Sequence, residues 1–187
     1  MKKIIIFLLV FAFINFISAC GSGILTGVNK LIEVGDTIQL GKIDWIVLTI
    51  DDGKALLLSD KIIETKAFDS ISNDWENSEI RKYLNGAFYD TKFNNQEKKK
   101  IAETRLTTEN QNRTDDKIFL LSVEEVNEYM GDNAHLNMRN AKIAENIETK
   151  DTWWWWLRSP GFENYETAYV EEDGNIYGHI GDLSGRN

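Results

Sequence analysis

The chain has very little cysteine: among its 187 residues there is one, Cys20. A lone thiol has no partner for a disulfide bond within the chain, so no covalent cross-link adds to the packed core. Catalysis by a pair of thiols is excluded for the same reason. An unpaired thiol is a liability in an oxidising compartment. If the protein is exported, Cys20 therefore needs a chemical role that masks it.

Positive charge is also scarce. The chain has 21 Lys and Arg residues against 30 Asp and Glu residues, a formal net charge of −9. Binding of nucleic acid requires many Lys and Arg side chains to neutralise phosphates, so this balance argues against a nucleic-acid partner. The basic run Lys98–Lys100 is better explained as one solvated face of a helix. Six Trp, six Tyr and nine Phe residues indicate a folded domain rather than a disordered chain.

The residue patterns of common enzymes are missing. The two histidines, His135 and His179, have no partners at metal-ligand spacing. The sequence contains no Gly-x-Ser-x-Gly elbow and no phosphate-binding loop. Glu171 and Glu172 are adjacent and would alternate between faces, so they do not form the carboxylate pair of a glycosidase. We therefore expect a non-enzymatic protein that needs no cofactor and no metal.

No apolar run is long enough to favour a membrane-spanning helix. The longest extends from Ile4 to Ala19 and contains Asn15 and Ser18, whereas a span needs about 20 apolar residues. This run follows two lysines and ends in small residues directly before Cys20. A basic start, a short apolar segment and small residues at the end are typical of a cleaved export signal.

The Ser18-Ala19-Cys20 junction resembles the lipobox of bacterial lipoproteins, in which the cysteine thiol is joined to diacylglycerol before the signal is removed. The resemblance implies a signal peptide over 1–19, a lipidated Cys20 that opens a flexible tether over 20–31, and a domain over 32–187. Each methylene buried in a membrane contributes about 0.8 kcal/mol, and a single lipid chain gives only marginal membrane binding. The two chains of a diacylglycerol anchor a protein stably. We expect a membrane-anchored, extracytoplasmic protein of the cell envelope. A membrane-spanning anchor and a plain cleaved signal remain alternatives.

The residue pattern of the domain predicts strands first, then helices, and strands again at the end. Residues 37–59 predict two strands joined by a turn at Asp51–Lys54, with apolar residues on both faces. A helix is expected along the apolar stripe from Ile80 to Phe88, which Gly86 would bend or end early. Two capping boxes, Asn94 with Glu97 and Ser122 with Glu125, each predict the start of a further helix. Other strands are expected over Lys117–Leu121, Trp153–Ser159, Ala168–Val170 and Ile176–Ile180. This order predicts an α+β domain with antiparallel sheets and segregated helices.

The C-terminal part resembles a family of uncharacterised bacterial extracellular domains. The resemblance depends on the heptapeptide Trp155–Gly161, with Ala168–Val170 and Asp173–Ile176 after it, and extends over most of residues 35–180. It implies a C-type-lectin-like fold, shared with formylglycine-generating enzymes and with variable ligand-binding proteins. Such domains continue into a strand near a Val-Arg-Pro, whereas this sequence ends in Ser184–Asn187, so we expect a shortened terminal strand. The calcium-binding triplets of calcium-dependent lectins are not evident either.

Aromatic residues near the C-terminus are the candidates for ligand binding. The run Trp153–Trp156 would alternate between two faces of a strand, and four exposed indoles would exceed the apolar patch that a monomer normally shows. At least two are expected in the core, with Trp153 and Trp154 at the surface. Arg158 is expected inside the fold, stacked on an indole and paired with a carboxylate. Side chains of the loop after Pro160 and of the final hairpin complete the predicted binding surface: Phe162, Tyr165, Tyr177 and His179.

These observations favour a membrane-anchored lipoprotein with a non-enzymatic domain that binds a glycan or a surface protein. Two alternatives stay open. One is an enzyme related to sulfatase-modifying or glycan-processing proteins. The other is a structural envelope lipoprotein that only contacts a partner protein.

Overall fold

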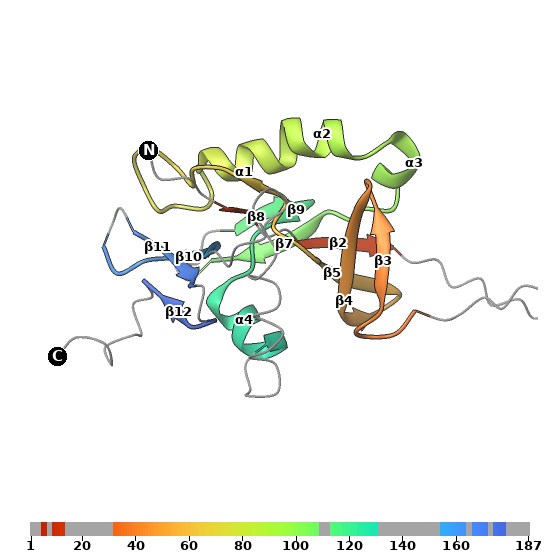
Figure 1. The fold of residues 1–187 in the computed structure, drawn as a ribbon. Helices are drawn as coiled ribbons and strands as arrows, with labels where there is room; N and C mark the ends of the chain where they lie inside the picture. The colour runs from red at the N-terminus through yellow and green to blue at the C-terminus, as the bar shows by residue number, and fades with distance from the viewer. Residues whose placement is uncertain are drawn as a thin grey trace, which may run out of the picture.

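Two antiparallel sheets lie at opposite ends of the molecule in Figure 1, with helices between and beside them. The computed structural model describes residues 5–6, 9–13, 32–108, 113–130, 154–163, 166–171 and 174–178. The larger sheet has five strands in the order β3-β4-β5-β2-β9, and the smaller sheet has the order β10-β11-β12. The pairs β1–β6 and β7–β8 stand apart from these sheets. The fold is therefore mixed α and β with antiparallel sheets and few helices, as the strand and helix patterns predict at this level.

The described strands and helices have the following bounds. The strands are β1 (Ile5–Ile6), β2 (Leu9–Phe13), β3 (Thr37–Leu40), β4 (Ile43–Asp51), β5 (Lys54–Ser59), β6 (Glu64–Thr65), β7 (Thr104–Thr107), β8 (Arg113–Asp116), β9 (Ile118–Phe119), β10 (Trp155–Pro160), β11 (Thr167–Val170) and β12 (Ile176–Tyr177). The helices are α1 (Glu79–Tyr83), η1 (Leu84–Phe88), α2 (Tyr89–Lys92), α3 (Asn95–Lys98) and α4 (Val123–Met130). None of the helices in the described ranges is long and apolar enough to cross a membrane.

Two tight turns build the first three strands of the five-stranded sheet. The predicted turn at Asp52-Gly53 joins β4 to β5, and both residues have positive φ, 45° and 72°. A second turn of the same kind at Gly41-Lys42, with φ of 63° and 60°, joins β3 to β4. Positive φ at both central residues matches the twist of a two-residue hairpin. Residues 37–59 thus form three strands rather than the predicted two, because Gly41-Lys42 is also a turn.

The apolar segment near the N-terminus lies inside this sheet. β2 pairs antiparallel with β5 along five residues, from Leu9 opposite Leu58 to Phe13 opposite Lys54. On its other side, β2 pairs antiparallel with β9, with Val10 opposite Ile118. These are residues for which the sequence predicts a signal peptide, and in the structure their backbone completes the sheet.

The predicted apolar stripe forms a continuous helical run, α1-η1-α2, seen along the top of Figure 1. Ile80, Leu84 and Phe88 are fully buried, as their spacing predicts. Gly86 has φ −115° and ψ −105°, outside helical values, and lies in the π-helical turn η1. The predicted bend at Gly86 is confirmed, because the helical run is kinked there and continues beyond it.

Both predicted capping boxes are present. The Asn94 side chain accepts hydrogen bonds from the N–H groups of Gln96 and Glu97, and the Glu97 carboxylate accepts from the Asn94 N–H. The Ser122 hydroxyl accepts from the Glu125 N–H, while the Glu125 carboxylate accepts from the Ser122 N–H. α3 and α4 therefore begin where the sequence predicts. The β7–β8 hairpin has no counterpart in the sequence-based prediction.

The core lies where the sheets and the helical run meet. Its largest fully buried side chains are Trp45, Trp75, Trp155, Phe88, Phe119, Leu57 and Leu58. The indole of Trp45 donates to the Leu40 carbonyl at 2.8 Å, and that of Trp75 donates to the Asp116 carboxylate at 3.1 Å. A buried indole N–H needs such a partner. These two hydrogen bonds join the core to β3 and to β8.

Candidate functional site

A row of aromatic rings crosses the three-stranded sheet. The strand register places Trp156 on β10 opposite Tyr169 on β11, and Tyr169 opposite Tyr177 on β12. The rings of Tyr169 and Tyr177 are stacked, with centroids 6.1 Å apart and planes 24° apart. Trp154 lies edge-on to Trp156 at 4.8 Å and to Tyr169 at 5.5 Å. We call these four rings the aromatic face.

The aromatic face is only partly covered. Trp154, Trp156 and Tyr169 are half-buried, and Tyr177 is 38% exposed. Trp155, which points to the other side of β10, is fully buried in the core. The predicted alternation of the Trp run is therefore confirmed for the three of these residues that the structure describes. A partly exposed group of aromatic rings of this type offers apolar area that a ring-shaped ligand can contact.

The charges of two carboxylates act on the aromatic face. Burial of the Tyr169 phenol raises its pKa, and the charge of Glu171, the phenol of Tyr177 and the charge of Glu166 add to the rise. The aromatic face therefore lies in the field of two negative charges. Hydrogen-bond acceptors beside an aromatic surface are the combination that a polyhydroxylated ring requires, since its faces are apolar and its edge carries hydroxyl donors.

One hydrogen-bond donor of the aromatic face has no partner among the described residues. The indole Nε1 of Trp156 is buried and has no hydrogen-bond partner among the residues that the structure describes. A buried donor without a partner costs about 1–3 kcal/mol. Such a group is rare in folded proteins.

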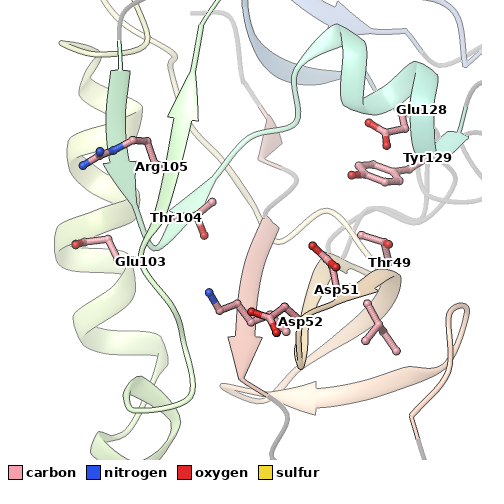
Figure 2. A pocket seen from close by; sticks show the side chains of 10 residues that line it. Thr49, Asp51, Asp52, Glu103, Thr104, Arg105, Glu128 and Tyr129 are labelled. Carbon is pink, nitrogen blue, oxygen red and sulfur yellow. The ribbon is translucent and has the colours of Figure 1, made fainter.

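A second concave region, which we call the acidic pocket, lies between the β4–β5 turn, β7 and α4 (Figure 2). It has a volume of about 650 Å³. Its lining carries four carboxylates and two basic groups: Asp51, Asp52, Glu103, Glu128, Lys54 and Arg105. In Figure 2, Tyr129 and Glu128 on α4 face Asp51 and Thr49 on β4.

Charge in the acidic pocket is unevenly balanced. Arg105 donates from Nε and Nη2 to the two carboxylate oxygens of Asp115 at 2.9 and 3.1 Å, so its charge is largely matched by a residue outside the lining. Burial raises the pKa of the Tyr129 phenol, and the charges of Glu128 and Glu125 raise it further. The pocket therefore has a negative potential. Its residues come from three distant segments, which is why no local sequence pattern predicts it.

Comparison with known proteins gives one match. The family DUF6273, described as a domain of unknown function, matches residues 52–184. The chain belongs to the DUF6273 family. No curated protein and no solved structure matches it. The expectation of an uncharacterised domain is thereby confirmed.

The matched DUF6273 region contains the whole aromatic face, whereas Cys20, β2, β3 and all of β4 precede it. Two of the predicted binding residues, Trp154 and Tyr177, meet in this face because each contacts Tyr169. Tyr169 itself is absent from the prediction. Its position one strand from both Trp156 and Tyr177 is the signal that would have identified it, but the strand register is needed to see it.

Of the other predicted residues of the DUF6273 domain, Phe162 is the one that the described ranges include. Phe162 lies on the β10–β11 loop and is 39% exposed. That loop is held by the Gly161 N–H, which donates to the Glu166 carbonyl at 2.7 Å, and by Asn73 Nδ2, which donates to the Glu163 carbonyl at 2.9 Å. Trp153, Tyr165 and His179, like Cys20 and His135, lie outside the described residues.

Arg158 belongs to the interior, as predicted. It is 5% exposed, forms an ion pair with Glu125 and donates from Nη1 to the Leu120 carbonyl at 2.7 Å. The ring beneath its guanidinium is that of Phe119, at 5.6 Å, rather than an indole. In the part of the DUF6273 chain that the structure describes, no group of three or more His, Cys, Asp or Glu residues is placed to hold a metal ion.

Proposed function

We propose that this DUF6273 protein is a lipoprotein, anchored in a membrane through Cys20, whose extracytoplasmic domain binds a glycan through the aromatic face. The observation that carries the proposal is the half-exposed row of Trp154, Trp156, Tyr169 and Tyr177 across β10–β12. Stacking contacts of this kind are worth about 0.5–1.5 kcal/mol each beyond the area that they bury. A glycan therefore gains affinity from several weak contacts made together.

The surroundings of the aromatic face support a polar ring as ligand. Glu166 and Glu171, whose charges raise the pKa of Tyr169, are the carboxylates that we propose as acceptors for sugar hydroxyl donors. We also infer a C-type-lectin-like topology, which is supported by the antiparallel sheets, the separate helices and the heptapeptide Trp155–Gly161.

The anchor and the binding domain are tested on the processed chain. The chain is expressed in bacteria with its own leader and fed a radiolabelled fatty acid. Lipid label and membrane fractionation are expected for wild type and lost for Cys20→Ala. A Cys20→Ala variant that still fractionates with membranes would contradict the lipoprotein proposal.

Ligand binding is tested with a glycan array on the detergent-purified processed chain, with and without calcium. Binding is expected to fall at least about tenfold in Trp154→Ala and Tyr177→Ala, because each removes a stacking surface. Val34→Ala is the matched control, since Val34 is 63% exposed and lies before β3, in the other sheet. Silence on every glycan, together with co-purification of one envelope protein, would favour the structural alternative.

A further inference from the structure

The five-stranded sheet contains one strand that the proposed maturation removes. β2 (Leu9–Phe13) lies between β5 and β9, and it is antiparallel to both. Cleavage before Cys20 would take β2 away from the domain. We call the gap that would remain between β5 and β9 the β5–β9 slot.

The strands on either side of the β5–β9 slot are buried. Leu57 and Leu58 on β5 and Ile118 and Phe119 on β9 have at most 1% of their surface exposed in the structure. Along an antiparallel pair, alternate residues turn both N–H and C=O toward the neighbouring strand. Five residues of β5 pair with β2, so removal of β2 leaves several backbone donors and acceptors without partners inside the domain. Such an edge is also a site for association with other chains.

Closing the slot by pairing β5 directly with β9 would break hydrogen bonds that hold these strands. Asn85 on η1 accepts hydrogen bonds from the N–H groups of Lys117 and Ile118 at 2.7 and 3.2 Å and donates to the Ile118 carbonyl at 2.9 Å. β5 is paired with β4 on its other side along six residues. Closure would move one strand by about 4.8 Å and break one of these sets of hydrogen bonds. An added strand fills the slot without breaking either set.

We propose that the β5–β9 slot of the processed chain takes an extended apolar segment of about five residues from a partner protein, by strand addition. The proposal rests on the proposed cleavage before Cys20. The position of Leu9–Phe13 specifies the occupant: it runs antiparallel to β5 and to β9, and its sequence is Leu-Val-Phe-Ala-Phe. In the precursor, the leader fills the position that the partner takes later.

The tether of the same chain is a poorer occupant. Residues 20–31 include Gly21, Gly23 and Gly27 and lack five consecutive apolar residues, and glycine weakens a strand interior. The proposed lipid on Cys20 also holds the start of this segment at the membrane. A segment of a partner protein is restricted neither by these glycines nor by the lipid on Cys20.

The first experiment tests whether the leader fills the slot in the full chain. In a Cys20→Ser background, the pairs Val10→Cys with Leu57→Cys and Phe11→Cys with Leu56→Cys join residues that face each other in the register. Along an antiparallel ladder, hydrogen-bonded and non-hydrogen-bonded pairs alternate, so one of these two pairs is non-hydrogen-bonded and has its side chains closer together. Mild oxidation is expected to cross-link at least one of them. The out-of-register pairs Val10→Cys with Ala55→Cys and Phe11→Cys with Leu58→Cys are the controls, expected to cross-link at least about tenfold less.

The second experiment tests the slot after processing. Hydrogen exchange is followed in the full-length Cys20→Ser chain and in the processed chain, alone and with a peptide of residues 8–14 flanked by lysines. The amides of residues 54–59 that face β2, which are every second one along β5, and the amide of Phe119 are expected to exchange at least about tenfold faster in the processed chain and to regain protection with the peptide. A peptide with proline in place of Phe11 is the control, because proline removes a backbone donor.

Three results would overturn the proposal. The first is equal protection of residues 54–59 in both chains with new protection of residues 24–28, because the tether would then fill the slot. The second is protection that appears only in a dimer of the processed chain, which would assign the slot to a second copy. The third is equal cross-linking of in-register and out-of-register pairs. Mass spectrometry of the N-terminal peptide from the chain made in cells distinguishes these results from failure of the lipoprotein proposal. A chain that keeps residues 1–19 contradicts only the proposed cleavage.

Discussion

Arg158 on β10 and Glu125 on α4 form a two-pronged ion pair, with Nη1 donating to Oε2 at 2.5 Å and Nη2 to Oε1 at 2.7 Å. The same carboxylate accepts the Ser122 N–H of the capping box at 2.9 Å. Arg158 also donates to the Leu120 carbonyl. One carboxylate therefore starts α4 and joins it to the sheet that carries the aromatic face.

Removal of Glu125 is expected to destabilise the domain strongly. Glu125→Ala would leave the Arg158 guanidinium buried without its counter-charge and remove half of the capping box, at a cost of about 2–4 kcal/mol in the free energy of unfolding. Denaturant unfolding of the variant measures this cost. The control is Asn127→Ala at an exposed position of the same helix, expected to change stability by less than about 0.5 kcal/mol. Equal losses in both variants would contradict this role of the pair.

Asn85 is expected to be the second sensitive polar residue, because its side chain takes the place of a neighbouring strand for β9. Asn85→Ala would leave two N–H groups and one carbonyl of Lys117 and Ile118 without partners. The expected loss is about 2–4 kcal/mol, measured by chemical denaturation. Asn95→Ala is the control: it removes the same amide group at an exposed position of α3, where water is available to the neighbouring backbone groups. An Asn85→Ala domain as stable as Asn95→Ala would show that water reaches the edge of β9.

What the sequence predicts well depends on contacts that are close along the chain. The two capping boxes and the turn at Asp52-Gly53 involve residues one to three positions apart, so their residue types alone predict them. The burial of Ile80, Leu84 and Phe88 follows from helical periodicity in the same way. In each case the local pattern and the tertiary structure favour the same arrangement.

The candidate sites could be predicted only in part, because they depend on strand register. Trp154 and Tyr177 are identifiable as surface aromatics, but Tyr169, which joins them, is found only when β11 is placed between β10 and β12. The acidic pocket gathers residues from β4, β7 and α4, which no sequence spacing relates. The apolar leader has the composition of an export signal and of a buried strand alike, so its pairing with β5 is not predictable from its residues.

The turn at Gly41 is expected to tolerate no side chain. A Cβ atom there would lie 2.7 Å from the ring of Phe93 and 2.9 Å from the Lys92 carbonyl, and φ is +63°. Gly53 is the matched control, since its φ is +72° but a Cβ atom added there would have no other atom within 4 Å. Gly53→Ala therefore measures backbone strain alone, about 1 kcal/mol. Gly41→Ala adds the collision, and a total loss of about 2–4 kcal/mol is expected in thermal or denaturant unfolding. Equal losses would mean that Phe93 moves aside without cost.

Glu97 is expected to make part of the stability dependent on pH. Its carboxylate accepts the N–H of Asn94 at 2.8 Å and, across the fold, the N–H of Gly41 at 2.9 Å. Because these hydrogen bonds favour the charged form, first that from Asn94 and then that from Gly41, the pKa of Glu97 in the folded protein lies below its ordinary value of 4.5. A carboxylate with a lowered folded pKa contributes stability above its unfolded pKa, and the contribution disappears as pH falls through the folded value.

The melting temperature of wild type and of Glu97→Gln is therefore expected to differ most near neutral pH. The difference should begin to shrink below about pH 4.5 and approach its minimum once the pH is below the folded pKa. Glu103→Gln, an exposed position before β7, controls for the loss of a carboxylate elsewhere on the acidic surface. A gap between wild type and Glu97→Gln that widens in acid would reverse the sign of the linkage. Such a result would mean that the hydrogen bond between Glu97 and the Gly41 turn does not join α3 to the β3–β4 hairpin in solution.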